Sequence, residues 1–315
     1  MSFHPPYHLR LNKAIDRFIL IDTIIKLERI NGLALANYTY YGLGGPYLEE
    51  FRILSELCPE MRMVSIEKDL DTLKRQRFHL PCKTLKLKNT DMKSFLINYD
   101  PRDEKSIFWL DYTNFNLSAI EDFQIILGKV ATNSIVKITL QAMPKDYIGE
   151  EKAETFRMEF GEFMPDPSID PPLYKKDFAK LLQDMLQIAT QQILPANLDT
   201  VYQPLTSFYY ADGANMFTLT GIVCKRSERK NIRNLFKNWR FANLNWAQPK
   251  HIDIPFLSTK ERLHLQKHLP VKQKNTGRRL MQALGYKIDK NTSAQLMKQY
   301  ADFYRYYPYF VKAEP

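Results

Sequence analysis

The chain has 315 residues, of which 44% are hydrophobic and 25% are charged. This composition is typical of a folded globular protein, and it excludes intrinsic disorder and fibrous structure for the bulk of the chain. The length suits one large domain with an accessory part. The most apolar early stretch, residues 18–25, contains Asp22 and is flanked by charged residues, so it is too short and too charged to span a bilayer or to act as a signal peptide.

The cysteines and the charge distribution add two further expectations. Three widely spaced cysteines, Cys58, Cys82 and Cys224, form neither a disulfide framework nor a CxxC motif, which favours a reducing compartment. Together with the short, charged apolar stretch, this predicts a cytoplasmic protein that does not bind a membrane. Residues 225–315 contain 20 Lys+Arg and 6 Asp+Glu, a net charge of +14, whereas the first 224 residues carry −4. Such a basic segment predicts contact with nucleic acid or another polyanion, and the alternative is a solvated surface that keeps the chain soluble.

The first predicted element is a helix over residues 10–30, because apolar residues recur there with helical spacing and neither Gly nor Pro interrupts them. It ends near Asn31-Gly32. Residues 38–41 are aromatic and β-branched and predict a strand. A Gly-rich turn over residues 42–46 follows, and helical periodicity returns from Tyr47.

Strands and helices then alternate. Strands are predicted over 61–66, 84–88, 107–110 and 134–140, and helices over 69–78, 92–97 and 117–130. Alternation at this spacing indicates parallel strands joined by right-handed crossovers, in a sheet covered on both faces.

The second half of the chain is less regular. Prolines interrupt residues 144–176, which predicts an insertion or lid, and an amphipathic helix covers 178–193. Residues 200–210 and 216–224 predict an antiparallel hairpin across the turn 211–215. The expected fold is a doubly wound α/β domain over 33–224 with a mostly parallel seven-stranded sheet. A helical cap over 1–32 precedes it, and a basic region over 225–315 follows, with helices over 232–241, 260–268 and 294–307.

Polar residues at the ends of the predicted strands are the candidate site. The turn Gly42-Leu43-Gly44-Gly45 would offer backbone amides to a nucleotide-like ligand, although the GxGxxG pattern is incomplete. Glu67, Asp91 and Asp111 follow three successive strands and converge on the same edge. The alternatives are a glycine turn needed only for packing, and acids that only cap helices.

This order of elements resembles the class I S-adenosylmethionine-dependent methyltransferases. The phrases at residues 7–13 and 107–113 are also similar to those of prokaryotic methyltransferase-like proteins. The resemblance implies a Rossmann-like fold with a terminal antiparallel hairpin, and S-adenosylmethionine as cofactor. By resemblance, the cofactor loop contains Gly42, Gly44 and Gly45, Glu67 binds the ribose, and Asp91 lies on the adenine side.

The same resemblance places residues 111–114 nearest to the transferred methyl group. Asp111 and Asn114 are the candidate catalytic residues, since methyl transfer requires a positioned acceptor and a group that accepts or orients a proton. Tyr112 and Phe115 could stack on a base or on the sulfonium, or could simply belong to the core. The Asp/Asn-Pro-Pro-Tyr signature of base amino methylation is absent.

The basic region contains two clusters interleaved with aromatic residues, a pattern that suits phosphate contact together with base stacking. The candidate nucleic-acid-binding residues are Lys230, Arg233, Lys237, Arg240, Lys272, Lys274, Arg278 and Arg279. The alternative is an amphipathic helix whose Phe236 and Trp239 pack inward.

The first hypothesis is therefore a methyltransferase-like protein that acts on or binds nucleic acid. The alternative is a catalytically inactive adaptor subunit of a nucleic-acid-associated complex, conceivably in prokaryotic defence. Tyr40 and Pro46 stand where the family usually has an acid and a glycine, which favours the adaptor, whereas the three strand-end acids favour the enzyme. No metal site is expected: His264 and His268 have the helical i, i+4 spacing, but no Glu accompanies them and the neighbourhood is basic.

Overall fold

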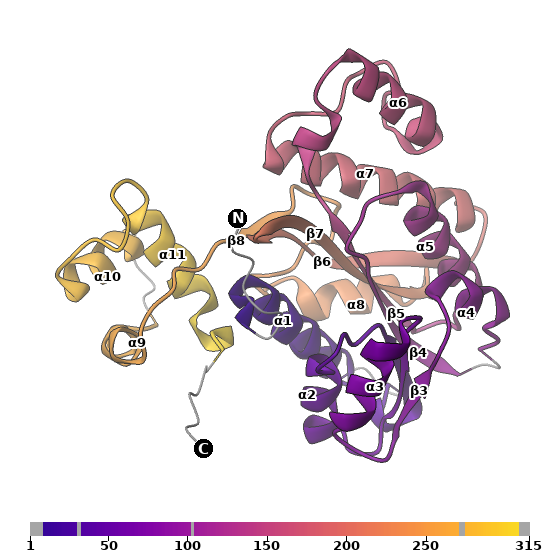
Figure 1. Cartoon of the computed structure of the whole chain (residues 1–315), viewed down its shortest axis with the longest axis horizontal. Helices are drawn as coiled ribbons and strands as arrows, with labels where there is room; N and C mark the ends of the chain where they lie inside the picture. The colour runs from indigo at the N-terminus through magenta and orange to yellow at the C-terminus, as the bar shows by residue number, and fades with distance from the viewer. Residues whose placement is uncertain (1–8, 30–32, 102–103, 271–274, 309–315) are drawn as a thin grey trace. The chain divides into compact units, whose positions relative to one another are not determined.

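The computed structural model describes residues 9–29, 33–101, 104–270 and 275–308 (Figure 1). The strands are β1 (Tyr38–Gly42), β2 (Arg62–Ile66), β3 (Leu85–Lys88), β4 (Lys105–Asp111), β5 (Ile135–Gln141), β6 (Thr200–Asp212), β7 (Ala214–Lys225) and β8 (Lys250–Ile252). The helices are α1 (Leu11–Leu27), α2 (Glu49–Leu57), α3 (Leu70–Phe78), α4 (Met92–Asn98), α5 (Leu117–Lys129), α6 (Glu150–Phe160), α7 (Lys175–Ile193), α8 (Arg229–Phe236), α9 (Thr259–Gln266), α10 (Thr276–Leu284) and α11 (Ser293–Phe303).

The sheet confirms the predicted α/β class. Its strand order is β3-β2-β1-β4-β5-β7-β6-β8, with β1 to β5 parallel and β7 antiparallel to β5. Strands β2 and β3 therefore lie on one side of β1, and the chain then crosses to the other side of β1, where β4 and β5 lie. This reversal is the switch point at which open α/β sheets bind their ligands.

The predicted number of strands was wrong: the described part of the chain forms eight, not seven. The additional strand is β8, which has only three residues, too few to show a hydrophobic period. The hairpin turn is also tighter than predicted, because Gly213 alone separates β6 from β7 and has a φ of 104°. A glycine tolerates this backbone conformation without steric cost.

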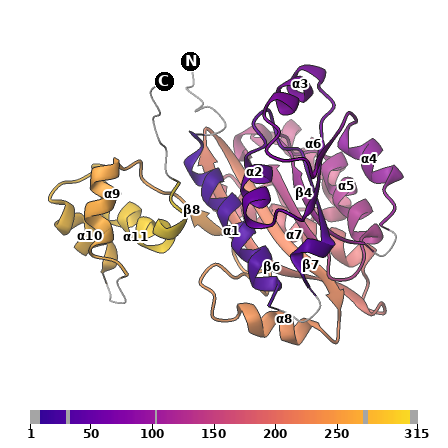
Figure 2. The same cartoon turned by 90° about the horizontal axis from the view of Figure 1, so that it is seen from below.

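Helices cover both faces of the sheet, as Figures 1 and 2 show. On one face, β4 and β5 pack against α4, α5 and α7 in a continuous apolar core, in which the rings of Tyr41 and Phe108 stack at 4.5 Å. On the other face, α2 contributes Phe51, whose ring meets Tyr40 edge-on at 5.0 Å. The strands β4 and β5 are buried almost throughout, as expected for the centre of a parallel sheet.

Local capping fixes where the crossover helices begin. Asp69 accepts a hydrogen bond from the amide of Thr72, and Asn116 accepts one from the amide of Ala119. These side chains satisfy amides that the first helical turn leaves without a partner. The helices α3 and α5 therefore begin directly after Asp69 and Asn116, which are residue types that favour the N-cap position.

The chain forms two compact units. The larger contains residues 20–209 and 214–250, and the smaller contains residues 1–19, 210–213 and 251–315. Within the smaller unit, the side chain of Asn12 joins three segments: its amide donates to the carbonyl of Ala211 at 3.0 Å, and its oxygen accepts from the amide of Ile254 at 3.1 Å. None of the helices in the described ranges is both long and apolar enough to cross a membrane.

The helix α10 in the smaller unit was not predicted. A Cβ on Gly277 would lie 1.9 Å from the carbonyl oxygen of Ala294, so α10 and α11 approach each other backbone to backbone. The sequence before α10 is basic and lacks an apolar period, and for that reason only the helices near residues 260–268 and 294–307 were expected.

Candidate active site

The glycine turn after β1 has a conformation that requires glycine. Gly44 and Gly45 have φ values of 67° and 55°, and the amide of Leu48 donates to the carbonyl of Gly44 at 3.1 Å. A Cβ on Gly44 would lie 2.7 Å from Leu48 Cδ2 and 2.8 Å from Phe51 Cε2. Both the backbone and the packing at Gly44 therefore exclude a larger residue.

A buried glutamine of α3 supports this turn. The side-chain amide of Gln76 donates to the carbonyl oxygens of Gly45 at 2.9 Å and Leu43 at 3.2 Å. The hydroxyl of Ser65 on β2 donates in turn to Gln76 Oε1 at 3.0 Å. Because Gln76 and Ser65 are fully buried, these bonds hold the turn in one shape. The sequence gives no signal for Gln76, since a polar helix residue is normally expected to face water.

Glu67 lies at the carboxyl end of β2. One carboxylate oxygen accepts from the amide of Asp69 at 2.8 Å, while Asn89 donates to the Glu67 carbonyl at 2.9 Å. Among the described residues the other carboxylate oxygen of Glu67 accepts no hydrogen bond. Asn89, which was not predicted as a site residue, therefore links the end of β3 to the end of β2.

Asp91 is exposed and caps α4, accepting from the amide of Ser94 at 2.9 Å. The hydrogen bond from Ser94 lowers the pKa of Asp91 below its ordinary value, so its carboxylate is ionised at neutral pH. Capping was the alternative that the sequence left open for this residue. A role on the adenine side of the cofactor remains a prediction.

Asp111 ends β4 opposite Thr139 on β5, and Asn114 is exposed in the segment that leads to α5. The aromatic residues of this segment pack inward: the ring of Phe115 stacks on Phe160 at 4.5 Å, and the hydroxyl of Tyr112 donates to Asp122 Oδ2 at 2.6 Å. Tyr112 and Phe115 therefore contact the core, whereas the side chain of Asn114 is open to solvent.

The register of the sheet brings the candidate residues to one edge. Gly42 pairs with Ser65 on β2 and with Trp109 on β4. Ile66 pairs with Lys88 on β3. The residues that follow these positions, Gly44, Glu67, Asp91 and Asp111, therefore lie in a row across the carboxyl ends of four parallel strands.

The predicted nucleic-acid-binding residues divide between the two units. Lys230 and Arg233 lie on α8 in the larger unit, with Lys237 and Arg240 just after it, and all except Arg233 are exposed. Trp239 packs edge-on against Phe236 at 5.5 Å, so the inward packing considered for these aromatics does occur. Arg278 and Arg279 are exposed on α10, and Lys272 and Lys274 lie outside the described residues.

The described ranges contain no group of three or more His, Cys, Asp or Glu side chains able to hold a metal ion. His264 and His268 face each other with their rings 5.3 Å apart, but a ring nitrogen of His264 lies 2.8 Å from the carbonyl of Ala283 and is engaged in a hydrogen bond. The pair therefore supports packing between α9 and α10.

Five parallel strands, a switch point between β1 and β4, and a terminal antiparallel hairpin are typical of class I methyltransferase-like proteins, a class whose cofactor is S-adenosylmethionine. A family described as "Putative O-methyltransferase" matches residues 5–315. The chain belongs to this family, and the predicted resemblance is confirmed. No curated protein matches the chain.

Several solved structures are similar to the chain at low identity. Trm1 from Pyrococcus horikoshii in complex with S-adenosylmethionine has a TM-score of 0.46 and 10% identity, covering 71% of this chain and 59% of that chain. The plantazolicin methyltransferase BpumL in complex with S-adenosylhomocysteine has a TM-score of 0.42 and 11% identity, covering 66% and 84%. The fibrillarin/Nop5p complex has a TM-score of 0.39 and 9% identity, covering 60% and 73%. The chain thus spans less than two thirds of the Trm1 chain.

Proposed function

We propose that the chain transfers a methyl group from S-adenosylmethionine to an oxygen atom of a nucleic acid. The observation that carries the proposal is the turn at Gly44, which lies at the switch point of the sheet and whose shape is held by Gln76. Open α/β sheets bind ligands at such a switch point, where a turn brings backbone amides near the start of a helix.

The donor set at this edge fits the proposed cofactor. Ribose hydroxyls and the adenine amino group are hydrogen-bond donors, and Glu67 and Asp91 supply carboxylate acceptors at the ends of β2 and β3. The cofactor supplies a methyl group that is activated by its bond to a sulfonium. Asp111 is then the group that accepts or orients the proton of the acceptor hydroxyl, and Asn114 is the exposed amide that orients the acceptor.

The nucleic-acid part of the proposal rests on charge. Residues 225–315 carry a net charge of +14, and the exposed cations include Lys230, Arg278 and Arg279. Lys and Arg side chains that neutralise phosphates make binding strongly salt-dependent. We infer that cations of this segment bind the phosphates of the substrate strand.

Calorimetry with S-adenosylmethionine and S-adenosylhomocysteine tests the cofactor site. The wild-type chain should bind both, and Glu67→Gln should weaken binding about tenfold, because a charge-assisted hydrogen bond is worth roughly 1.5–3 kcal/mol. Glu56→Gln, at an exposed position of α2, is the matched control and should bind like wild type. A folded wild-type sample that gives neither heat nor a thermal shift with either compound would remove the proposal.

Transfer of a radiolabelled methyl group to RNA and DNA oligonucleotides tests the substrate. Charge reversal of Arg278 and Arg279 to Glu should weaken oligonucleotide binding and flatten its salt dependence. Lys152→Glu, at an exposed position of α6, is the control and should leave the salt slope unchanged. Cofactor binding without transfer to any oligonucleotide would keep the methyltransferase and exclude the nucleic-acid substrate.

A further inference from the structure

A basic pocket of about 460 Å³ lies where β7 leads into α8, within the larger unit. Four cationic side chains line it together with two side-chain amides: Arg226, Arg229, Lys230, Arg233, Asn234 and Asn245. Arg226 and Arg229 belong to the first basic cluster of the sequence but were not among the candidate nucleic-acid-binding residues. The pocket is shallow and open to solvent, so an ion from solution can reach it.

Neutral oxygens hold the three guanidinium groups in place. Arg226 donates from Nε to the carbonyl of Leu198 at 2.6 Å, and Arg229 donates from Nε to Gln203 Oε1 at 2.7 Å. Arg233 donates to the carbonyl of Leu244 at 2.6 Å and, from its other terminal nitrogen, to Asn245 Oδ1 at 2.6 Å. These bonds orient the cations without neutralising them.

No carboxylate in the described ranges forms an ion pair with these four cations. The nearest acid in sequence, Glu228, accepts instead from the amide of Lys225 at 3.2 Å. Within the described ranges, the side chain of Arg229 donates only from Nε, so both of its terminal nitrogens keep their N–H donors for a ligand. Four positive charges thus share one pocket, and none of them has an ion-pair partner among the described residues.

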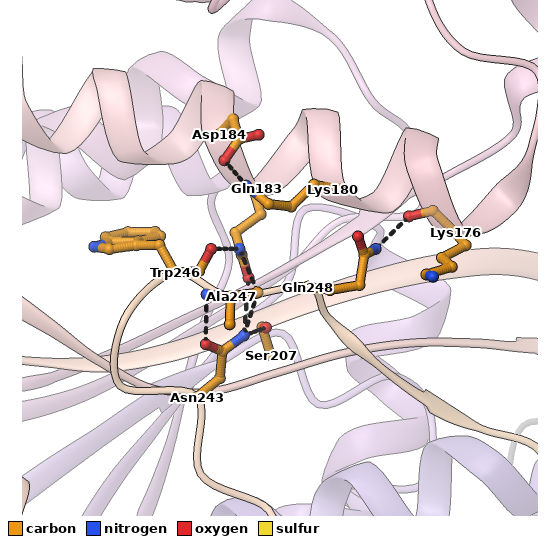
Figure 3. A network of polar contacts seen from close by, with 9 residues as sticks. All are labelled: Lys176, Lys180, Gln183, Asp184, Ser207, Asn243, Trp246, Ala247 and Gln248. Carbon is orange, nitrogen blue, oxygen red and sulfur yellow. Dashed lines mark hydrogen bonds and ion pairs between the residues drawn. The ribbon is translucent and has the colours of Figure 1, made fainter.

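The partners of Arg233 belong to a loop that buried hydrogen bonds anchor to the sheet and to α7. Figure 3 shows that Asn243 joins this loop to α7 and β6: its amide donates to Ser207 Oγ at 2.6 Å and to Gln183 Oε1 at 3.3 Å. Gln183 donates in turn to the carbonyl of Ala247 at 2.9 Å. Gln183, Ser207 and Asn243 are buried, so the loop that orients Arg233 is fixed before any ligand arrives.

Burial and nearby positive charges both affect the pKa of Arg229. Burial, followed by the neighbouring charges of Arg233 and Arg226, lowers the pKa of Arg229 from its ordinary value. A bound anion would relieve this repulsion. Because a guanidinium presents a planar fork of N–H donors, the best match among anions is a tetrahedral oxyanion with several acceptor oxygens.

We propose that the pocket formed by Arg226, Arg229, Lys230 and Arg233 is a phosphate-binding site. Since β7 runs antiparallel to β5, its end lies at the edge of the sheet opposite to Gly44 and Asp111. The seven residues of β5 separate the two edges by about 23 Å, at about 3.3 Å per residue. The site is therefore distinct from the methyl-transfer edge, and a small phosphorylated molecule bound in it cannot reach that edge.

Two sources of the phosphate group are compatible with this position: a backbone phosphate of a polynucleotide that spans both edges, or a small phosphorylated molecule. Thermal unfolding of the full chain with inorganic phosphate, against chloride at equal ionic strength, tests the site. Phosphate should stabilise the wild type. Arg229→Gln should need at least about tenfold more phosphate than the wild type for the same rise in unfolding temperature. Lys230→Gln should need about threefold more.

Arg77→Gln, at an exposed position of α3, is the matched control and should respond like wild type. The side chain of Lys230 makes no hydrogen bond to the described residues, so its variant tests the site even where loss of Arg229 perturbs folding. Equal responses of all four proteins, or no response of the wild type, would overturn the proposal.

Single-stranded oligonucleotides then distinguish the sources. If a backbone phosphate is the ligand, Arg229→Gln should weaken oligonucleotide binding about tenfold, and inorganic phosphate should compete with the strand. If the ligand is a small phosphorylated molecule, Arg229→Gln should bind oligonucleotides like the wild type but should no longer be stabilised by phosphate. Either result supports the site. If the phosphate proposal fails, the result of the cofactor titration still stands, because that titration measures binding at the opposite edge of the sheet.

Discussion

The side-chain amide of Gln76 lies 2.9 Å from the carbonyl oxygen of Gly45 and donates a hydrogen bond to it. This bond connects the helix that follows β2 with the turn that follows β1, across 31 residues of sequence. The shape of the candidate cofactor loop thus depends on a neighbouring crossover unit as well as on its own glycines. A side chain that touches no ligand can therefore control whether the loop binds one.

Replacing Gln76 by Leu should destabilise the fold and weaken cofactor binding together. The substitution removes the donor to the Gly45 carbonyl, leaves the Leu43 carbonyl with only the hydroxyl of Ser65, and takes the acceptor Oε1 from that hydroxyl. Each unsatisfied buried group costs about 1–3 kcal/mol, and less where the group is only partly buried. Urea unfolding and calorimetry with S-adenosylhomocysteine measure the two effects. Gln191→Leu, at an exposed position of α7, should change the free energy of unfolding by less than about 0.5 kcal/mol. Equal behaviour of the two variants would contradict the role of Gln76.

Replacing Gly44 by Ala should be more harmful than an ordinary glycine substitution. Its φ of 67° and the 2.7 Å approach of Leu48 Cδ2 both oppose a side chain, and we expect a loss of about 2 kcal/mol or more. Gly161→Ala is the control, since Gly161 has a helical φ of −53° and a Cβ there would meet nothing within 4 Å. That variant should be neutral or stabilised by up to about 1 kcal/mol. The comparison of the two unfolding midpoints decides the prediction.

Much of the sheet could be predicted from the sequence, because alternation of strands and helices is a local pattern that also specifies topology. The apolar run at residues 107–110 and the turn at Gly42 to Gly45 show this most clearly, since both occupy the places expected for them. The three residues of β8 could not be predicted, because their pairing depends on β6 about forty residues earlier.

The candidate residues were harder to predict, because their environment depends on distant segments. The sequence identified Glu67, Asp91 and Asp111 as acids at strand ends, and the structure places them along one edge. It gave no signal for Gln76, whose burial only the fold reveals. The pocket around Arg229 was missed for the same reason, since its partners come from residues 195–203 and 244–245.

Asp122 should make stability depend on pH. Burial raises the pKa of Asp122 above its ordinary value of 3.8, despite the hydrogen bond from Tyr112 that opposes the rise. The folded state therefore binds the proton more tightly than the unfolded state does. The resulting stabilisation is fully present below pH 3.8 and is lost as the pH rises through the raised pKa that Asp122 has in the folded state.

The variant Asp122→Asn tests this dependence, because its amide oxygen can still accept from Tyr112 but cannot titrate. We expect the variant to gain stability relative to the wild type as the pH rises from about 4 to about 7. The gain is about 1.4 kcal/mol for each unit by which the pKa is raised, and less where solvent reaches the carboxylate. Urea unfolding of both proteins across this range measures it, and parallel curves would show that Asp122 titrates normally.

Cys224 should resist alkylation while the protein is folded. Its side chain is fully buried near the end of β7, and burial raises the pKa of its thiol to about 12. The thiolate is the reactive form, so both access and ionisation disfavour reaction. Cys58 and Cys82 are only half-buried and should react first with iodoacetamide at about pH 8. Mass spectrometry should find Cys224 modified only after denaturation. If Cys224 of the native protein reacted as fast as Cys82, the end of β7 would have to open readily. The adjacent start of the proposed phosphate pocket, at Arg226, would then open with it.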